Sequence, residues 1–385
     1  MIPRTLFDES HEIFRHVVRR FVESEVAPFH GEWEKAGFVP KSIWRKAGEA
    51  GLLCCMIPEQ YGGGGGSFVH SAIVIEELAR AGASGPAFSL HSDIVAPYLL
   101  AYASEDLKQR WLPQMASGAV LGAIAMTEAS GGSDLKAMRT QAVRDGDSYV
   151  VNGQKTFITN AQGAGIIVLA CKTDPAAVRK GISLLLVEAD RPGVSLGRRL
   201  EKIGYKAQDT SEVFFSDVCV PLANLLGQEG RDFYQLMHHL AQERLVQAVK
   251  SVASAEAVLA WTIDYVEQRQ AFGQRLADFQ NTRFKIADLT ASICACRVLV
   301  DRCIELHVQG QLAASDAAIA KLQSSELLGR TTDECLQLFG GWGYMWEMPV
   351  ARAYADARMA RLAAGSSEII RQIIADSVLA RPEVK

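Results

Sequence analysis

The chain has 385 residues, which is too many for one ordinary hydrophobic core and enough for two or three domains. Its 40 Lys and Arg residues face 44 Asp and Glu residues, and the net charge of -4 excludes a global basic field that would attract nucleic acid. The eight cysteines show neither metal-ligand spacing nor the density of a disulfide scaffold, so we expect reduced thiols and no metal site.

The amino terminus has none of the features of a targeting signal. Acidic residues begin at Asp8, and no basic segment followed by an apolar core precedes them. The apolar runs of the chain are far shorter than the roughly 20 residues that a membrane span needs. We therefore expect a cytoplasmic protein without a membrane span.

The first part of the chain has apolar residues at helical spacing. One amphipathic helix is predicted from Ser10 to a point before Pro28. Gly118 is a plausible stop for the last of the helices that follow, which are predicted around residues 42–53, 69–81 and 104–115. Residues 1–118 are expected to form an all-helical N-terminal domain.

The pattern changes after Gly118 to short β-rich runs separated by Gly, Asp and Pro. Asp145-Gly146 and Asn152-Gly153 are each typical of a tight hairpin turn. Later runs such as ISLLLVE and EVFFSDV continue the pattern, with no stretch of helical length between them. Residues 119–232 are expected to form a small β-barrel or sandwich domain.

Long helical periods return from Phe233 onward. After the first long helix, three more are predicted near residues 283–307, 312–338 and 366–380. This count matches a four-helix bundle, so residues 233–385 are expected to form a C-terminal bundle domain. The fold class predicted for the whole chain is α+β.

Three glycine-rich segments could bind a ligand or could be ordinary turns. Gly62 to Gly66 does not follow a buried strand and no P-loop lysine follows it, which favours a surface turn over a phosphate loop. Residues 126–134 combine adjacent glycines with three hydroxyl side chains, and either a bound polar group or a capped loop is compatible with them. For residues 337–347, a helix end with aromatic rings packed in the core is favoured over a site for a flat ligand.

Glu243 and Arg244 lie in the first long helix of the bundle. Leu240 and Leu245 flank them, so Glu243 falls beside the apolar stripe and can point inward. An inward carboxylate has a raised pKa and is a better proton acceptor near neutral pH. The residues alone favour a structural alternative, in which Glu243 pairs with His239 or complements the helix dipole in the first turn.

Five separated segments resemble motifs of the acyl-CoA dehydrogenase family, in the same order along nearly the whole chain. They are Met126-Thr-Glu with Gly132-Ser-Asp134, Phe157-Ile-Thr-Asn160, Arg269-Gln-Ala-Phe-Gly273, Gln337 to Gly343, and Gly365-Ser-Ser-Glu-Ile369. Among subfamilies the chain looks most similar to long-chain acyl-CoA dehydrogenases, through Gln242-Glu-Arg-Leu245, Ala207-Gln-Asp-Thr210 and Gly340 to Pro349. The resemblance implies a flavoprotein of fatty-acid β-oxidation with a helical domain, a β-domain and a four-helix bundle.

The resemblance implies FAD as cofactor and assigns residues to it and to the substrate. The positions that match FAD contacts are Met126, Thr127, Gly132, Ser133, Phe157, Ile158, Thr159, Arg269, Phe272, Gln280, Gln337, Leu338, Gly340, Gly341, Ser366 and Glu368. Those that match acyl-CoA contacts are Ser133, Arg244, Ala364 and Gly365. Several of the FAD positions would reach the flavin of a neighbouring subunit, so a homodimer or homotetramer is implied.

The chain departs from the pattern of many family members at the proton acceptor. Those members carry their catalytic glutamate immediately before the glycine of the final motif, where this chain has Ala364. Long-chain and isovaleryl-type members take the base from the first bundle helix, at the residue that precedes an arginine. The resemblance therefore assigns the catalytic base to Glu243, with Glu368 as the remaining rival.

The reaction implied is α,β-desaturation of a long-chain or branched acyl-CoA to a trans-2-enoyl-CoA. Glu243 would accept the α-proton, flavin N5 would accept the β-hydride, and the Ala364 N–H would polarise the thioester carbonyl. An electron-transferring flavoprotein would then take the electrons. An acyl-CoA oxidase or flavin monooxygenase on the same fold stays open, and the negative charge balance argues against a flavin-containing relative that binds nucleic acid.

Overall fold

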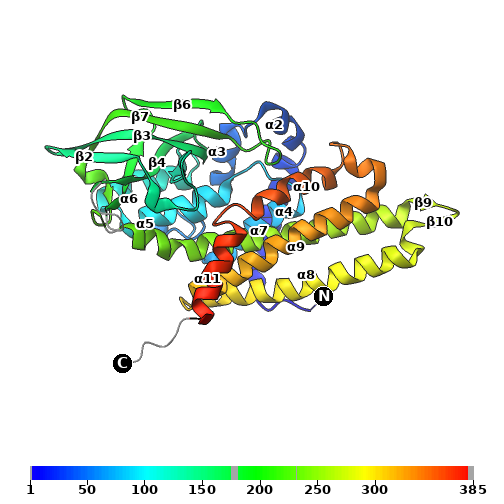
Figure 1. Cartoon of the computed structure of the whole chain (residues 1–385). Helices are drawn as coiled ribbons and strands as arrows, with labels where there is room; N and C mark the ends of the chain where they lie inside the picture. The colour runs from blue at the N-terminus through cyan, green and yellow to red at the C-terminus, as the bar shows by residue number, and fades with distance from the viewer. Residues whose placement is uncertain (1, 175–180, 231, 380–385) are drawn as a thin grey trace.

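The structure is a computed structural model that describes residues 2–174, 181–230 and 232–379. The N-terminal part is helical, as the sequence predicted, and it packs beneath the sheet and against the long helices (Figure 1). Its helices are α1 (Glu9–Phe21), α2 (His30–Ala36), α3 (Lys41–Glu49), α4 (Phe68–Arg80), α5 (Ala96–Tyr102) and α6 (Glu105–Ala116).

Local side chains explain where several of these helices begin and end. Asp8 caps α1, because its carboxylate accepts a hydrogen bond from the His11 N–H at 3.0 Å. Ser67 and Ser104 cap α4 and α6 in the same way. Gly118 has a φ of +68°, a left-handed conformation that turns the chain out of the last helix, as the sequence predicted.

The middle of the chain forms one mixed sheet. Its strands are β1 (Leu121–Ala125), β2 (Gln141–Asp145), β3 (Ser148–Thr159), β4 (Ala164–Lys172), β5 (Ile182–Glu188), β6 (Val194–Arg199), β7 (Thr210–Pro221) and β8 (Leu225–Leu226). The order is β6-β7-β3-β2-β4-β5-β8, and β1 pairs with β4 in parallel. Strands β4 and β5 are buried on both faces. Their side chains on one face pack with other strands of the sheet, and those on the other face pack with the N-terminal helices.

One of the two turns predicted in this region is wrong. Asp145-Gly146 does join β2 to β3, whereas Asn152-Gly153 lies inside β3, which continues to Thr159. The pairing of β3 with β7 shifts register at this point, as it does at a β-bulge. A Cβ on Gly153 would lie 2.5 Å from the Thr140 Oγ1, so the glycine serves a close approach of backbone and not a turn.

The C-terminal part is the expected bundle with one more helix. The long helices are α7 (Asp232–Gln268), α8 (Gln280–Val308) and α9 (Ala314–Phe339), followed by α10 (Pro349–Ala360) and α11 (Ser367–Leu379). The sequence did not predict α10, because its buried face consists of Val350 and three alanines, which give a weaker signal than a row of large apolar residues. The predicted end of the last helix, Ala380, lies outside the described residues.

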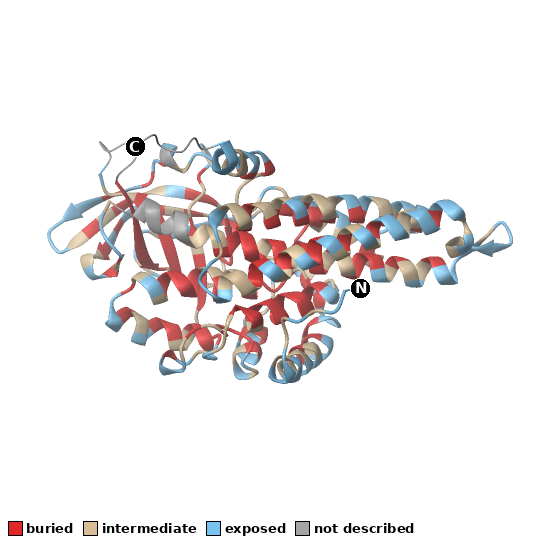
Figure 2. Cartoon of the chain, turned by 90° about the horizontal axis from the view of Figure 1, so that it is seen from below, coloured by how far each residue is buried: buried red, intermediate tan, exposed pale blue. Residues whose placement is uncertain are grey.

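Helix α7 is the element that joins the parts of the molecule. Its apolar face packs with α4 and α8 in one core, which contains Phe68, Ala72, Leu245, Val249 and Val300. Figure 2 shows buried residues along the inner faces of the long helices and exposed residues at the tip, where the hairpin of β9 (Gln270–Ala271) and β10 (Gln274–Arg275) projects. Within the described part of the chain, no helix is both long and apolar enough to cross a membrane.

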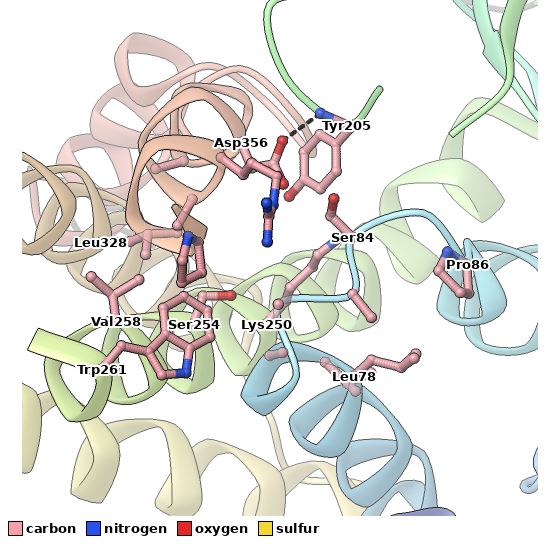
Figure 3. Close-up of a pocket in the computed structure, with 18 of the residues that line it drawn as sticks. Leu78, Ser84, Pro86, Tyr205, Lys250, Ser254, Val258, Trp261, Leu328 and Asp356 are labelled. Atoms are coloured by element: carbon pink, nitrogen blue, oxygen red, sulfur yellow. Dashed lines mark hydrogen bonds between the residues drawn. The ribbon is translucent and has the colours of Figure 1, made fainter. Parts of the chain in front are cut away.

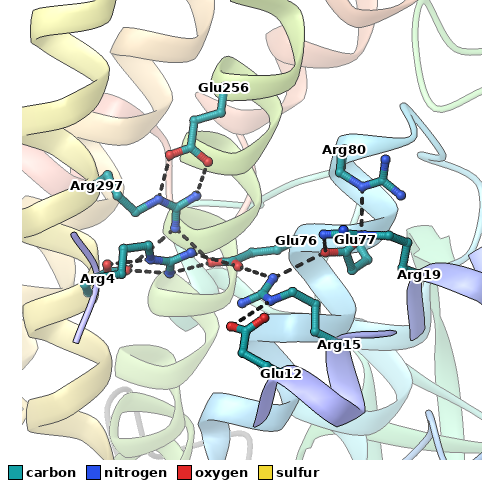
Figure 4. A network of polar contacts seen from close by, with 10 residues as sticks. Arg4, Glu12, Arg15, Arg19, Glu76, Glu77, Arg80, Glu256 and Arg297 are labelled. Carbon is teal, nitrogen blue, oxygen red and sulfur yellow. Dashed lines mark hydrogen bonds and ion pairs between the residues drawn. The ribbon is translucent and has the colours of Figure 1, made fainter. Parts of the chain in front are cut away.

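A buried ion-pair network also joins the N-terminal part to the bundle (Figure 4). Glu76 of α4 accepts hydrogen bonds from Arg4 at 2.8 and 3.0 Å, from Arg15 of α1 at 2.9 Å and from Arg297 of α8 at 2.9 Å. Arg297 also donates to Glu256 of α7, at 2.8 and 2.5 Å. The position of α4 against α7, which carries Glu243, thus depends on charges from five segments of the chain.

Candidate active site

Glu243 lies on α7 and points into the protein, with 7% of its surface exposed. Because α7 begins at Asp232, Glu243 is well past the first turn, and the proposed interaction with the helix dipole is wrong. Its Oε1 accepts a hydrogen bond of 3.1 Å from the hydroxyl of Tyr98 on α5. The N-terminal part of the chain and the bundle therefore meet at this carboxylate.

The surroundings of Glu243 suit a proton acceptor. Burial raises the pKa of Glu243 to about 7, and the Tyr98 hydrogen bond and the charge of Arg244 oppose that rise. A carboxylate with this pKa is ionised in a large fraction of molecules at neutral pH and binds a proton far more readily than an exposed glutamate does. The side chain can thus take up a proton under ordinary conditions.

Arg244 is the next residue and is also buried, at 3% exposed. Burial lowers its pKa, against the opposing effect of Glu243. Its buried Nε has no hydrogen-bond partner among the residues that the structure describes. Because a buried donor without a partner is costly, Arg244 is suited to an acceptor group from a bound molecule.

A buried lysine anchors the loop before α11. Lys321 of α9 is fully buried, and its Nζ donates a hydrogen bond of 2.6 Å to the carbonyl of Gly365. Ala364 has a φ of +54°, which is uncommon for a residue with a Cβ and sets the direction of its N–H. Burial and, to a smaller extent, the charge of Arg244 lower the pKa of Lys321 to about 8, so Lys321 lies within electrostatic range of the residue next to Glu243.

Glu368, the rival carboxylate, lies in different surroundings. Its side chain is 79% exposed at the start of α11. Hydrogen bonds from its own backbone N–H and from Ser366 lower its pKa. Glu368 is therefore a solvated acid that holds a proton weakly.

The segment around Thr127 is held rigidly against β3. Lys155 is fully buried, and its Nζ donates to the Met126 carbonyl at 3.0 Å and to the Glu128 Oε1 at 2.9 Å. The Thr156 N–H donates to the Thr127 carbonyl at 2.9 Å. The Thr127 side chain stays half-exposed, whereas Gly132 and Ser133 lie on the surface of the same loop.

Phe157 follows on β3 and is 64% exposed, with a φ of +60°. The pairing of β3 with β7 shifts register between Lys155 and Ile158, which turns Phe157 outward while Ile158 stays buried. Thr159 next to them is half-exposed. The exposed Phe157 ring can stack on a flat molecule, and the hydroxyls of Thr127 and Thr159 can bind the polar edge of the same molecule.

A second group of the residues assigned to FAD lies at the far end of the bundle. Arg269, Phe272 and Gln280 are exposed around the β9–β10 hairpin, where Phe272 is 96% exposed. Glu243 lies in α7, and Arg269 directly follows the last residue of that helix. The 26 residues between their positions correspond to roughly 39 Å along the helix axis. Within one chain these residues do not join the site around Glu243.

Residues 337–341 end α9 and share this distant region. Gln337, Gly340 and Gly341 are exposed, whereas Leu338 is half-buried. Phe339 is buried and stacks on Tyr265, but Trp342 and Tyr344 are 52% and 84% exposed. Trp346 is also exposed, at 38%, so the expectation that the aromatic rings of this segment pack in the core is wrong for three of them.

A cavity that opens to solvent on one side lies between α4, α7, α9 and α10 (Figure 3). Helix α7 contributes Lys250, Ser254 and Trp261 to its wall. They follow Glu243 by 7, 11 and 18 residues, which places all four on one face of the helix. Leu78, Val258 and Leu328 make much of the remaining wall apolar.

Tyr98, Lys155, Lys321 and the cavity were not identified from the sequence. A tyrosine in a helix and a lysine in a strand or helix are common, and their usual place is a packed core or a solvated face. Buried lysines without a local acidic neighbour leave no signal in one sequence. Only the contacts between distant segments reveal these residues.

The chain is similar to known proteins over nearly its whole length. Three family models match the chain, described as the N-terminal, middle and C-terminal domains of acyl-CoA dehydrogenase, over residues 8–119, 123–218 and 230–379. The chain is 47% identical to the long-chain specific acyl-CoA dehydrogenase of Sus scrofa over 378 residues, 98% of this chain and 88% of that protein.

Two solved structures have the same fold. An acyl-CoA dehydrogenase from Geobacillus kaustophilus superposes with a TM-score of 0.96 and 46% identity, and the match covers 98% of this chain and all of that one. An acyl-CoA dehydrogenase from Bacillus anthracis, solved in complex with FAD, gives a TM-score of 0.92 at 31% identity. That match covers 97% of this chain and 67% of the other.

Proposed function

The chain belongs to the acyl-CoA dehydrogenase family of FAD-dependent oxidoreductases, and from this premise we propose that Glu243 is its catalytic base. The observation that carries the proposal is the buried carboxylate of Glu243, with its raised pKa, in a chain that has Ala364 at the other position known for the base. The reaction is the conversion of an acyl-CoA to its trans-2-enoyl-CoA, with the two hydrogens transferred to FAD as a proton and a hydride.

The residues around Thr127 fit one flavin ring. Thr127 and Thr159 are half-exposed and offer hydroxyls, and Phe157 offers an exposed face. Lys155 keeps the loop in place through the Met126 carbonyl, so the donors are preorganised. FAD, when bound here, supplies the acceptor for the β-hydride.

The protein's own groups then handle the proton and the charge. Glu243 takes the α-proton, and its burial keeps water from competing for it. The Ala364 N–H donates a hydrogen bond to the thioester carbonyl and stabilises the negative charge that develops there. Lys321 holds that N–H in place through Gly365, and Arg244 offers its unpaired Nε to the acyl-CoA.

A long acyl chain suits the cavity along α7. The cavity wall begins seven residues beyond Glu243 and extends to Trp261, which corresponds to roughly 10 to 27 Å along the helix axis. Leu78, Val258 and Leu328 offer apolar contacts over this distance. We infer a long-chain or branched acyl-CoA as the substrate class.

The two separate groups of FAD residues support an assembly of more than one chain. Arg269, Phe272 and Gln280 are exposed and far from Thr127 and Phe157, so they are available to the cofactor of a second copy. We infer a homodimer, which can pair into a homotetramer. We also infer an electron-transferring flavoprotein as the acceptor that reoxidises the enzyme.

The base is tested by Glu243→Gln, with Glu368→Gln as the matched control. We expect Glu243→Gln to keep its FAD and to lose bleaching of the flavin by acyl-CoA by at least about 10²-fold, because the proton acceptor is gone. Glu368→Gln is expected to bleach at the wild-type rate. Unchanged bleaching in Glu243→Gln would refute the assignment. The same assay with acyl-CoAs of increasing length and branching measures the substrate class.

A further inference from the structure

A tyrosine from the N-terminal part of the chain contacts the proposed base. Tyr98 is fully buried on α5, and its hydroxyl lies 3.1 Å from the Glu243 Oε1, although the two residues are 145 positions apart. We propose that Tyr98 is a positioning residue, which orients the Glu243 carboxylate and sets the pH at which it accepts the α-proton. This inference rests on the proposed function of Glu243.

The surroundings of Tyr98 fix its hydroxyl in this position. Its ring packs on His239 at a centroid distance of 4.5 Å and on Tyr102 at 6.3 Å. Beside Glu243, the Gln242 Nε2 donates a hydrogen bond of 2.6 Å to the carbonyl of Asp93, just before α5. These contacts hold α5 against α7 and keep the fully buried ring of Tyr98 beside Glu243.

The hydrogen bond acts on the charged form of Glu243. Burial disfavours the carboxylate, and a neutral donor at 3.1 Å offsets part of that cost without adding a charge. Burial and the charge of Glu243 raise the pKa of Tyr98, so the phenol stays protonated and remains a donor. The bond occupies Oε1 and leaves Oε2 as the atom that takes the proton.

Other titratable or charged groups also lie around Glu243, and none replaces Tyr98. Arg244 and His239 belong to α7 itself, and Tyr102 lies beside Tyr98 at the end of α5. Lys321 of α9 acts on Arg244 through its charge. Arg244 offsets burial by charge alone, whereas Tyr98 is the group that fixes one carboxylate oxygen in direction.

The test is the pH dependence of flavin reduction by acyl-CoA in the FAD-loaded Tyr98→Phe enzyme. Loss of a hydrogen bond to a charged group should move the acid limb of the rate profile upward by about one pH unit. On the acidic side of the limb, reduction should be about tenfold slower than in the wild type, and at alkaline pH the difference should largely vanish. The affinity for acyl-CoA should stay close to that of the wild type.

Tyr61→Phe is the matched control, because the Tyr61 hydroxyl donates to the Glu105 Oε2 at 2.9 Å on another surface of the N-terminal part. Its profile should coincide with the wild-type profile. An unshifted limb in Tyr98→Phe overturns the proposal, and so does a loss of stability with an unshifted limb, which would show a packing role alone. A shift of the limb in both variants overturns it as well.

A second variant keeps the test decisive if Tyr98→Phe does not fold. Fluorotyrosine at position 98 is a stronger donor, so the limb should move to lower pH, and an unmoved limb overturns the proposal. The Glu243→Gln experiment tests the proposed function of Glu243 independently of the role of Tyr98. If that variant bleaches normally, Glu243 is not the base; if it does not bleach and Tyr98→Phe has an unshifted limb, only the role of Tyr98 fails.

Discussion

Replacing Glu76 by glutamine should destabilise the fold far more than the same change at a half-exposed carboxylate at the edge of its ion-pair network. Glu76 is 6% exposed and accepts hydrogen bonds from Arg4, Arg15 and Arg297, which come from three different segments (Figure 4). Glutamine keeps the shape but removes the negative charge. Three arginines would then face a neutral amide in a buried place.

The size of the effect follows from the pKa of Glu76. Burial alone would raise this pKa, but the charge of Arg297 and the hydrogen bond and charge of Arg4 outweigh burial and hold it at about 2, against an ordinary value of 4.5. That difference corresponds to about 3 kcal/mol of unfolding free energy. Removal of one partner from a buried ion pair costs about 3–5 kcal/mol in general, which agrees.

The direction of the Glu76 pKa shift makes the contribution of Glu76 to stability depend on pH. Because the pKa of Glu76 is lower in the folded chain than in the unfolded chain, its contribution is fully present above pH 4.5. The contribution is lost as the pH falls from 4.5 toward about 2. The stability gap between wild type and Glu76→Gln should therefore be constant near neutral pH and close in acid.

Urea unfolding of the FAD-loaded enzyme, followed by circular dichroism, measures this gap. Glu12→Gln is the control, since Glu12 is half-exposed and lies 3.5 Å from Arg15 at the solvent edge of the same network. It should cost at most about 1 kcal/mol. Equal unfolding midpoints for Glu76→Gln and Glu12→Gln, or a gap that does not close in acid, would refute the reasoning.

Three further outcomes follow from the site. Lys321→Met should keep FAD but slow flavin reduction by about tenfold or more, because the Gly365 carbonyl loses its donor. Stopped-flow bleaching measures the rate of flavin reduction, and a wild-type rate would contradict this expectation. Ser254→Phe should narrow the cavity and reduce flavin bleaching by long acyl-CoAs by about tenfold, while short acyl-CoAs react normally. An equal loss for long and short acyl-CoAs would exclude the cavity as the site of the acyl chain. Lys155→Met should lower the FAD content of the purified protein, because the Met126 carbonyl loses a donor and the buried Glu128 loses its opposite charge. Full FAD occupancy would argue against this role.

Some features of the fold were predictable because their causes are local. Helical periods and the Asp145-Gly146 turn lie within short windows, and the structure confirms the helical N-terminal part, the β-rich middle and the bundle. Asn152-Gly153 was misread because the same dipeptide serves a turn and a bulge, and only the neighbouring strand distinguishes them. The inward direction of Glu243 was also readable, since the apolar stripe of one helix defines its inner face.

The amino-acid sequence by itself determined the order of the helical, β-rich and bundle parts and the family. It also showed a glutamate at 243 together with an alanine at 364, because each of these features lies in residues close together or in the order of motifs. Only the tertiary structure decided what surrounds the carboxylate. The pKa of Glu243 depends on its burial inside the folded chain and on the hydroxyl of Tyr98, 145 residues away. Such contacts are set by how the helices pack, and no local pattern records them.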